Sequence, residues 1–503
     1  MKLSVKTLPL KTERLSVVLN QDDAEDLGIL PGDRVKILVG RESFIAEVET
    51  STEIIKKGEI GLDTFTAESC NLNEQCKVEI HPVERPESVE FIRKKFEGKK
   101  YKKDEMKKIV SDIASNILND IELAAFILAN EIVGLDTDEI EWITWSMYES
   151  GERISFERGN VVDSSSIGSV LGNRYAMVTV PTVAAAGLLI PKTASRAITS
   201  ASGTADTMEV LADVNLSVDE IKEIVEKVGG VIAWGGATNI APADDKILRM
   251  EHQLGITSKA CLISSLLAKK LGIGAKYVVV DIPISEEAKI ENLDEGRNFA
   301  SLFVEVGRRV GLKLSILISD GTQPLCKAVG PALEAREVLR AMENKEENEL
   351  VEKGLEIASM LMEYGGIENS NALARKIFES GKTLEKFKEI IAAQGGDEKI
   401  KSEDIPVGEK RYTVNAGRGG IIQKISIKAI NEIARAAGAP KDKGAGVYIH
   451  KKRGEVVKVG EPILTIYAEK DWKLDKAIEV ARRENPIIVS GMVLEVIRGG
   501  VKV

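Results

Sequence analysis

One stretch, Pro191–Val210, most constrains what this chain can fold into. Its single arginine, Arg196, is surrounded by hydroxyl residues at Ser195, Thr199, Ser200, Ser202 and Thr204. Hydroxyls donate hydrogen bonds and a guanidinium fork matches phosphate, while Gly203 lets the backbone approach a ligand closely. A strand-like run ends near Pro191 and a helical pattern begins at Asp206. Donor-rich loops between a strand and a helix bind phosphate in α/β proteins, so the stretch predicts an anion-binding loop.

From residue 155 the chain alternates apolar strand-like runs with amphipathic helical runs. Strands are expected over 175–180, 230–234, 277–282 and 312–318. Helices are expected over 219–228, 259–270 and 296–307, and further helical segments from 331 to about 395. This alternation predicts a central α/β domain with helices packed on a sheet, which we expect to be mixed.

Three further segments have different patterns. Residues 1–84 alternate apolar and polar positions, which predicts a small β-barrel with strands over 15–19, 34–39, 43–48 and 76–80. Residues 85–155 have helical periodicity, with Thr137 as the expected N-cap of the helix that contains Trp142 and Trp145. From 410 on, strands are divided by glycine turns, and Val456–Leu464 resembles the hammerhead half of biotinyl or lipoyl domains. No Met-Lys-Met hairpin accompanies it, so we expect a structural domain rather than a carrier.

The predicted fold is therefore an α/β multidomain protein. Its parts are an N-terminal small β-barrel, a helical domain, a central α/β domain with a mixed sheet, and a C-terminal barrel-sandwich (biotinyl-like) domain. The expected boundaries are 1–84 for the barrel, 85–155 with a second piece at about 242–272 for the helical domain, 156–241 with 273–400 for the α/β domain, and 410–503 for the C-terminal domain.

Composition excludes several classes of function. A net charge of −10 over 503 residues argues against nucleic-acid polymers as partners, because phosphate backbones require a basic face. No apolar run approaches the roughly 20 residues of a membrane span, and the first residues lack a signal peptide's apolar core, so we expect a cytoplasmic protein with no membrane partner. Cysteine spacing suits neither a disulfide framework nor a zinc site, so we expect free thiols and no metal at Cys70, Cys76, Cys261 and Cys326.

Five segments carry a family resemblance over essentially the whole chain. They are SRAITSASGTADTMEV (195–210), WGGATNIAPADD (234–245), SSLLAKKLG (264–272), VGPALEAREVL (329–339) and AINEIARAAGAPKDKGAGV (429–447). With them the chain resembles the thymidine (pyrimidine-nucleoside) phosphorylase family, and most closely its archaeal AMP phosphorylase branch. The resemblance implies phosphorolysis, in which phosphate attacks C1′ of a nucleotide. AMP, with CMP and UMP as further substrates, would give the free base and ribose 1,5-bisphosphate.

The resemblance also implies a nucleotide site. The 5′-phosphate and sugar would be bound by the loop at Arg196, with further charge from Lys289, and the base by Ser265 and Lys269. The full set of implied nucleotide-binding residues is Gly168, Ser169, Ser195, Arg196, Ala197, Ile198, Thr199, Ser200, Thr204, Ser265, Lys269 and Lys289. The family closes two domains around the substrate, so the resemblance places the cleft between the helical and α/β domains.

The segment Asp163–Tyr175 departs from the family's pattern for the attacking phosphate. Phosphate would be bound by Ser164, Ser165, Ser166 and Arg174, but Ser165 stands where the family has histidine, Ser169 replaces the second glycine, Arg174 replaces lysine and Tyr175 a small hydroxyl residue. Ala194 stands where serine is usual, and Thr257 where the archaeal branch has its catalytic aspartate. A threonine hydroxyl is too weak an acid to protonate a leaving base near neutral pH. His252 is the alternative proton donor.

Two hypotheses stay open from the sequence. One is a working AMP (nucleoside 5′-monophosphate) phosphorylase, an enzyme that needs inorganic phosphate as co-substrate and no cofactor. The other is a nucleotide-binding paralogue that has lost catalysis and regulates or assembles with an active phosphorylase. Since the family forms oligomers, a homodimer or larger homo-oligomer is expected, alone or with an active paralogue.

Overall fold

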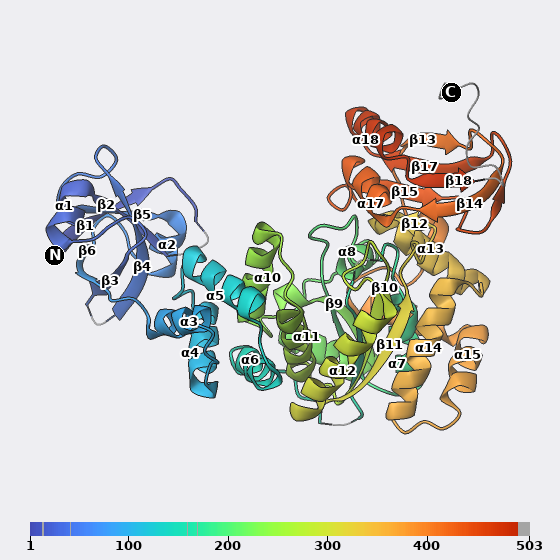
Figure 1. The fold of residues 1–503 in the computed structure, drawn as a ribbon, viewed down its shortest axis with the longest axis horizontal. Helices are drawn as coiled ribbons and strands as arrows, with labels where there is room; N and C mark the ends of the chain where they lie inside the picture. Colours follow the sequence, from blue (N-terminus) through green and yellow to red (C-terminus); the bar gives the residue numbers. More distant parts are fainter. Residues whose placement is uncertain (13–14, 41, 158, 169, 491–503) are drawn as a thin grey trace. The chain divides into compact units, whose positions relative to one another are not determined.

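The computed structural model describes residues 1–503 except 13–14, 41, 158, 169 and 491–503 (Figure 1). Two compact units are present. One contains Met1–Ser150 and Pro242–Cys261, and the other contains Gly151–Ala241 and Leu262–Val503. Within the described ranges, no helix combines the length and the apolar character that crossing a membrane requires.

The first unit begins with a closed barrel, as predicted. Its strands follow the order β1-β5-β2-β4-β3-β6. Their bounds are β1 (Lys2–Leu8), β2 (Ser16–Asn20), β3 (Arg34–Val39), β4 (Glu42–Ser51), β5 (Glu59–Asp63) and β6 (Lys77–Pro82), with helices α1 (Gln21–Leu27) and α2 (Thr64–Ser69). Alternate residues such as Leu19, Ile37 and Ile60 fill the interior and are fully buried. Strands β1 and β5, which pair in parallel, were not among the predicted strands.

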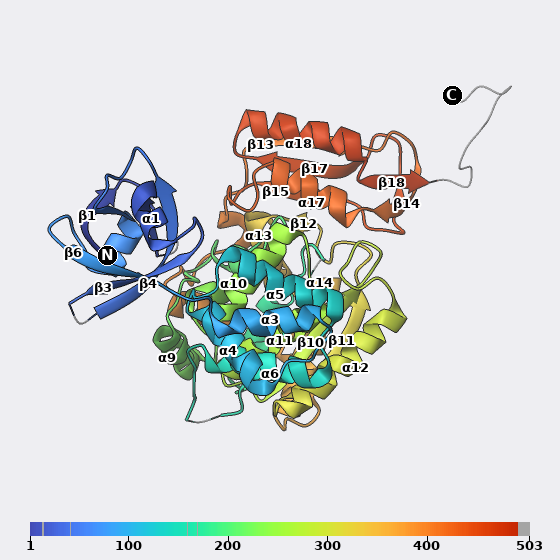
Figure 2. The same cartoon turned by 60° about the vertical axis from the view of Figure 1, so that its left-hand side comes forward.

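The rest of this unit is helical. Its helices are α3 (Glu87–Phe96), α4 (Lys103–Ala114), α5 (Asp120–Val133), α6 (Thr137–Glu149) and α10 (Pro242–Leu254). Helix α10 packs against α4 and α5, and Figure 2 shows α3, α4, α5 and α6 as one group. The N-cap of α6 is Asp136, not Thr137 as predicted: the Asp136 carboxylate accepts a hydrogen bond from the Glu139 backbone N–H at 2.9 Å. Because Asp136 supplies this acceptor, Thr137 becomes the first helical residue.

The second unit contains the central α/β domain. Its described strands are β7 (Val162–Ser166), β8 (Ile190–Ala194), β9 (Gly230–Trp234), β10 (Tyr277–Ile284) and β11 (Lys313–Asp320). β10 pairs in parallel with both β7 and β11, β8 pairs in parallel with β9, and a parallel bridge joins Val161 to Leu189. The prediction of a mixed sheet was therefore wrong for this domain. Parallel strands buried on both sides are the arrangement that intervening helices produce.

Helices cover this sheet. They are α7 (Ala176–Ala185), α8 (Thr204–Met208), α9 (Val218–Val228), α11 (Lys259–Gly272, in this unit from Leu262), α12 (Leu293–Arg309), α13 (Pro331–Asn344), α14 (Glu349–Tyr364), α15 (Ser370–Glu379) and α16 (Lys382–Ala393), with short turns η1 (Gly235–Ala237) and η2 (Ser402–Asp404). Figure 1 shows α12 alongside β10 and β11, against which it packs. Helix α7 packs against α14, α15 and α16 in the main apolar core.

Two local predictions in this domain were wrong. Residues 176–180 form the start of helix α7 rather than a strand, and Tyr175 is the N-cap of this helix. Every residue from Ala176 to Ala184 is buried, and a run that is apolar on all sides has no periodicity to separate a helix from a strand. Conversely, residues 162–166, which were not among the predicted strands, form strand β7, and β8 continues past Pro191 to Ala194. Both strands contain polar residues, so neither has the apolar run or the alternation by which the other strands were predicted.

The C-terminal segment forms two antiparallel sheets with the predicted glycine turns between strands. One sheet has the order β12-β15-β17-β13 and the other β16-β14-β18. Their elements are β12 (Ala328–Val329), β13 (Lys410–Asn415), β14 (Gly420–Ile425), α17 (Ile427–Ala436), β15 (Gly446–Ile449), β16 (Val456–Val457), β17 (Pro462–Ala468), α18 (Asp471–Glu484) and β18 (Ile487–Ser490). Because β12 comes from the chain before α13, the C-terminal sheet is joined directly to the α/β domain.

The buried pair Lys95–Glu139 generates a stability prediction for the helical region. The Glu139 carboxylate accepts hydrogen bonds from Lys95 Nζ at 2.7 Å and from the Tyr101 N–H at 2.9 Å, and both charged side chains are at most 3% exposed. We expect Glu139→Ala to lower the free energy of unfolding by about 3–5 kcal/mol, because it leaves a buried ammonium unpaired. Urea unfolding followed by tryptophan fluorescence, to which Trp142 and Trp145 on the same helix contribute, measures this.

A matched control is Glu97→Ala. Glu97 pairs with Lys99, but both side chains are more than half exposed, so the transition should stay where it is. Equal transitions for the Glu139 and Glu97 variants would contradict the assignment of Lys95–Glu139 as a supporting pair.

Candidate active site

A cavity of about 560 Å³ opens at the carboxyl ends of β7 and β8. Because these strands run in parallel, the loops that follow them, 167–175 and 195–203, meet at the same edge of the sheet. The wall also includes Glu286 and Glu287 from the β10–α12 connection, and Lys428 and Asn431 from helix α17. The predicted anion-binding loop therefore does lie at the edge of an α/β sheet.

The structure brings the predicted anion-binding loop and the predicted phosphate-binding segment Asp163–Tyr175 to this one cavity. The predicted residues that line it are Ser165, Ser166, Gly168, Arg174, Ser195, Arg196, Thr199, Ser200 and Thr204. Ser164 is fully buried behind the wall, and Ala197 and Ile198 belong to the loop but do not line the cavity. Ser169 lies outside the described residues.

The other predicted site residues lie elsewhere. Ser265 and Lys269 are one turn apart on α11, and Lys289 is exposed in the β10–α12 connection; these three do not line the cavity. His252, in the last turn of α10, and Thr257, which follows that helix, are exposed and belong to the first unit. The role of His252 as proton donor stays a prediction, as does the assignment of Thr257 to the position of the family acid.

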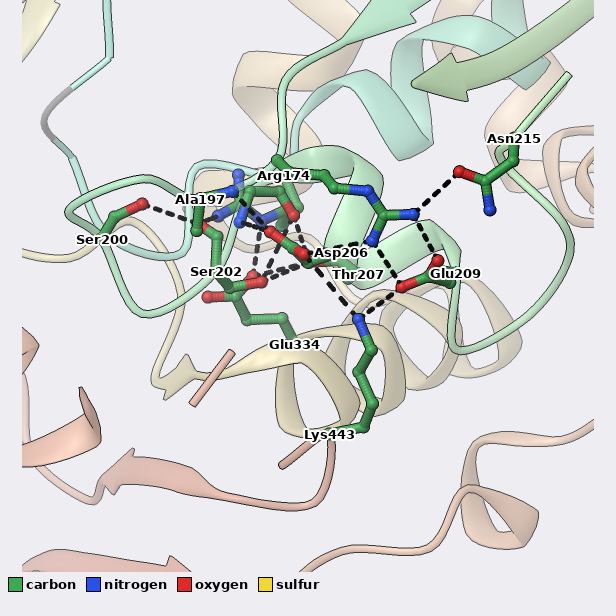
Figure 3. Close-up of polar contacts among 12 residues, drawn as sticks. Arg174, Ala197, Ser200, Ser202, Asp206, Thr207, Glu209, Asn215, Glu334 and Lys443 are labelled. Carbon is green, nitrogen blue, oxygen red and sulfur yellow. Dashed lines mark hydrogen bonds and ion pairs between the residues drawn. The ribbon is translucent and has the colours of Figure 1, made fainter. Parts of the chain in front are cut away.

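Asp206 fixes the shape of the 195–204 loop (Figure 3). Its carboxylate accepts hydrogen bonds from the backbone N–H groups of Ala197, at 2.6 Å, and Gly203, at 2.9 Å. A Cβ at position 203 would lie 2.4 Å from the Ser195 carbonyl oxygen, so only glycine fits there. The loop is thus closed on itself by an acid from the first turn of helix α8.

Arg196 is paired rather than free. Its guanidinium donates to both carboxylate oxygens of Glu209, at 2.8 and 2.5 Å, and to Asn215 Oδ1 at 3.1 Å, and it lies 4.7 Å from the ring centre of Trp234. Lys443 donates to the same carboxylate at 2.6 Å, and Figure 3 shows this lysine reaching Glu209. Hydrogen bonds from Arg196 first, and then Lys443, lower the pKa of Glu209 to about 2. The charge of Arg196 is therefore shared with Glu209 at neutral pH.

Arg174 joins the two loops. Its Nε donates to Glu334 Oε2 at 2.5 Å, Nη2 to the Ser202 carbonyl at 2.6 Å, and Nη1 to the Asn173 carbonyl and Thr204 Oγ1 at 3.1 and 3.3 Å. These bonds use four of the five N–H donors of a guanidinium. The predicted phosphate ligand is thus also the residue that fixes one loop against the other.

Two buried carboxylates that the sequence analysis missed support these loops. Asp281 on β10 accepts hydrogen bonds from Ser166 Oγ at 2.8 Å, Asn173 Nδ2 at 3.1 Å and Ser319 Oγ at 2.5 Å, and it pairs with Lys353 at 2.8 Å. Asp163 on β7 pairs with Lys270 and lies 3.9 Å from Lys192 Nζ. The available signal was a charged residue within an apolar strand, as in Tyr277–Ile284, since such charges are almost never buried unpaired.

Helix α17 of the C-terminal domain contacts the backbone of the 195–204 loop. Asn431 Nδ2 donates to the Thr199 carbonyl at 2.9 Å, and Arg435 Nη1 donates to the carbonyls of Ile198 and Ser200 at 3.1 and 3.2 Å. Near the start of the same helix, the Lys428 N–H donates to Glu287 at 2.9 Å. The C-terminal domain therefore forms part of the cavity and holds its main loop.

Family comparisons agree with this arrangement. Residues 89–151 match the helical bundle domain of the glycosyl transferase family, and residues 158–384 match its a/b domain. Residues 421–487 match the pyrimidine nucleoside phosphorylase C-terminal domain. The fold is also similar to a crystal structure of anthranilate phosphoribosyltransferase from Thermus thermophilus, with a TM-score of 0.51 and 17% identity over 61% of this chain and 99% of that one. The molecule is thus a glycosyl transferase-type protein with a phosphorylase C-terminal domain.

Curated relatives extend along almost the whole chain. AMP phosphorylase 2 of Archaeoglobus fulgidus is 62% identical, over 98% of each chain. AMP phosphorylase 1 of the same organism is 58% identical over 97% of each, and AMP phosphorylase of Thermococcus kodakarensis is 46% identical over 98% of this chain and 99% of its own. The chain belongs to the AMP phosphorylase family.

The contacts from α17 generate a prediction about nucleotide binding. Replacing Asn431 and Arg435 together by alanine removes three hydrogen bonds to the loop backbone. Since each is worth about 0.5–1.5 kcal/mol, the three together are worth about 1.5–4.5 kcal/mol, and we expect the affinity for a 5′-nucleotide to fall by at least about 10-fold as the loop loses its order. Titration calorimetry with AMP measures the loss. Arg483→Ala on the neighbouring helix α18 is the control, because this exposed arginine pairs with Glu432 and Glu484 and not with the loop backbone. Equal affinities for the two proteins would contradict this role of α17.

Proposed function

We propose that this protein is a nucleoside 5′-monophosphate phosphorylase that acts on AMP, and also on CMP and UMP, in nucleotide salvage. Inorganic phosphate attacks C1′, the bond to the base breaks, and free base and ribose 1,5-bisphosphate leave. One observation supports this most strongly: the two donor-rich loops predicted for the nucleotide and for the attacking phosphate line a single cavity. Full-length similarity to proteins named AMP phosphorylase supports the same conclusion.

The 195–204 loop has the chemistry for the 5′-phosphate and ribose. The hydroxyls of Ser195, Thr199, Ser200 and Thr204 surround the cavity beside Arg196, so they donate hydrogen bonds to phosphate and sugar oxygens. We assign the base to Ser265 and Lys269 on α11, and an additional charge to Lys289. Because the loop is fixed by Asp206, Glu209 and helix α17, the nucleotide is bound by groups already in place, which lowers the entropic cost of the reaction.

The attacking phosphate belongs to the wall formed by β7 and the loop that follows it. Ser165 and Ser166 line the cavity there, with Gly168 and the remaining N–H of Arg174. Hydrogen bonds to phosphate oxygens position the nucleophile against C1′. The bound anion then stabilises the positive charge that develops at C1′ as the glycosidic bond breaks and the electron pair leaves with the base.

The departing base needs a proton or an equivalent hydrogen bond. Thr257 occupies the position of the family acid, but its hydroxyl does not ionise near neutral pH. We therefore propose His252 as the alternative donor, because imidazole is the side chain that most often transfers a proton in enzymes. Removing a general acid typically slows a reaction about 10²–10⁴-fold without abolishing it, so a phosphorylase without the aspartate still turns over.

The location, the oligomeric state and the cofactor requirement of the enzyme are proposed from the family resemblance. We propose that the enzyme works in the cytoplasm as a homodimer or larger homo-oligomer, and that it needs phosphate but no cofactor. The two sheets of the C-terminal domain suit a barrel-sandwich of the biotinyl type used as structure.

The test is phosphorolysis by the purified chain alone. AMP, CMP, UMP and GMP are each incubated with and without inorganic phosphate, and free base is measured by chromatography. We expect base release only with phosphate, and most from AMP. Nucleotide binding without release of any base would contradict the proposal and favour the paralogue hypothesis instead.

A second prediction concerns the 5′-phosphate. We expect Arg196→Ala to weaken AMP binding by about 10- to 100-fold, since a charge-assisted hydrogen bond contributes roughly 1.5–3 kcal/mol. Adenosine, which lacks the phosphate, should bind the variant nearly as it binds the unaltered protein. Calorimetric titration with both ligands provides its own control, and an equal loss for AMP and adenosine would refute the role of Arg196.

A further inference from the structure

Four cationic side chains line the cavity, and their partners differ. They are Arg174, Lys192, Arg196 and Lys428. Arg174 is paired with the buried Glu334, and Arg196 with both oxygens of Glu209. Lys428 is exposed on helix α17. Lys192 on strand β8 differs from these three residues. It is buried, and no carboxylate oxygen of the described residues lies within 3.5 Å of its Nζ.

The partners of Lys192 leave its charge largely uncompensated. Its side chain is 7% exposed, and its Nζ donates to two neutral acceptors, the Ser164 carbonyl at 2.7 Å and the Thr193 carbonyl at 3.0 Å. The nearest carboxylate oxygen is Asp163 Oδ1 at 3.9 Å. The other oxygen of that carboxylate, Oδ2, is bound by Lys270, which is also buried. When both amines are protonated, two ammonium groups share one carboxylate, and one positive charge is left beside the cavity.

A buried excess charge is costly unless an opposite charge meets it. An ammonium has three N–H donors, and the two carbonyls use two of them. The hydrogen bond from Lys192 Nζ to the Ser164 carbonyl places the ammonium at the strand that continues into Ser165 and Ser166, which line the same cavity. An anion at this wall would therefore meet one ammonium and two hydroxyls.

We infer that Lys192 supplies the positive charge that binds the attacking phosphate, while Arg174 chiefly fixes the two loops. This inference rests on the proposed function, because it assigns a residue to the second substrate of that reaction. Lys192 was not among the binding residues predicted from the sequence, although it lies within the predicted anion-binding stretch Pro191–Val210.

The surroundings of Lys192 couple anion binding to protonation. Burial first, and then Lys270, lower the pKa of Lys192 to about 7, against the opposing effect of Asp163. The charged and titratable groups that face it are Asp163 from β7 and Lys270 from α11, with Tyr175 near Asp163 and the charged residues of the cavity wall beyond. Below this pKa the ammonium binds an anion, and above it the neutral amine does not. Affinity for a dianion should therefore fall by up to about tenfold per pH unit above pH 7.

The experiment measures binding without turnover. Sulfate, a dianion from about pH 6 to about pH 9, is titrated by calorimetry into the protein saturated with AMP, so that the 5′-phosphate site is already filled. We expect the sulfate affinity of the unaltered protein to fall at least about tenfold over this range. Lys192→Arg, which stays charged, should keep sulfate binding and lose most of the pH dependence. Lys192→Met should lower sulfate affinity at about pH 6 by at least 10-fold, with AMP affinity changed less than about 3-fold.

The control variant is Lys276→Met, an exposed lysine outside the cavity wall, which should behave as the unaltered protein. A flat pH profile in the unaltered protein, or undiminished sulfate binding by Lys192→Met, would overturn the inference. The pH profile needs no variant, so a folding defect in Lys192→Met would not block the test. Absence of base release in the phosphorolysis assay would refute the proposed function separately, since sulfate binding does not depend on turnover.

Discussion

The buried ion pair between Arg174 and Glu334 is the interaction on which the site depends. It fixes the loop after β7 to helix α13, and the other N–H groups of Arg174 hold the backbone of the 195–204 loop at Ser202. Losing one partner of such a pair typically costs about 3–5 kcal/mol, because the other charge stays buried and unpaired. In their described residues, neither loop has regular secondary structure of its own between strand and helix, so the shared cavity exists because buried charges hold both loops in place.

Three buried carboxylates hold the residues of the cavity wall in position. Glu334 pairs with Arg174. Asp281 accepts hydrogen bonds from Ser166 and Asn173 of the β7–α7 segment. Asp163 pairs with Lys270 and lies 3.9 Å from Lys192 Nζ. Each carboxylate comes from a regular element of the α/β domain, and each contacts a residue at or near the cavity wall. The C-terminal domain adds contacts from its own helix to the 195–204 loop. Rigid elements thus set the positions of loop residues, as precise binding of a small anionic substrate requires.

The sequence was sufficient for the loop itself, because hydroxyl residues and one arginine between a strand and a helix identify it locally. It was insufficient for Lys192, Asp163 and Asp281, because a charge inside a strand gains its role from partners far away in the chain: Asp163 pairs with Lys270, and Asp281 with Lys353. The relative direction of paired strands also depends on residues far apart in the chain. The sheet was therefore predicted as mixed, but its described pairs are parallel. Helix α7 was mistaken for a strand because its valines and threonines are buried on all sides. One departure from the family pattern, arginine for lysine at position 174, has a structural explanation, because the Arg174 guanidinium binds Glu334 and the Ser202 carbonyl within the protein. Nothing in the structure explains threonine for aspartate at position 257.

The most direct test of this account is a crystal structure of the protein with AMP and sulfate bound together. The account predicts the AMP phosphate on the 195–204 loop, and sulfate at the β7 wall with an oxygen about 2.7–3.2 Å from Lys192 Nζ and from the hydroxyls of Ser165 or Ser166. Arg174 should keep its bonds to Glu334 and Ser202. Sulfate bound away from Lys192, or AMP bound outside the cavity, would contradict the account.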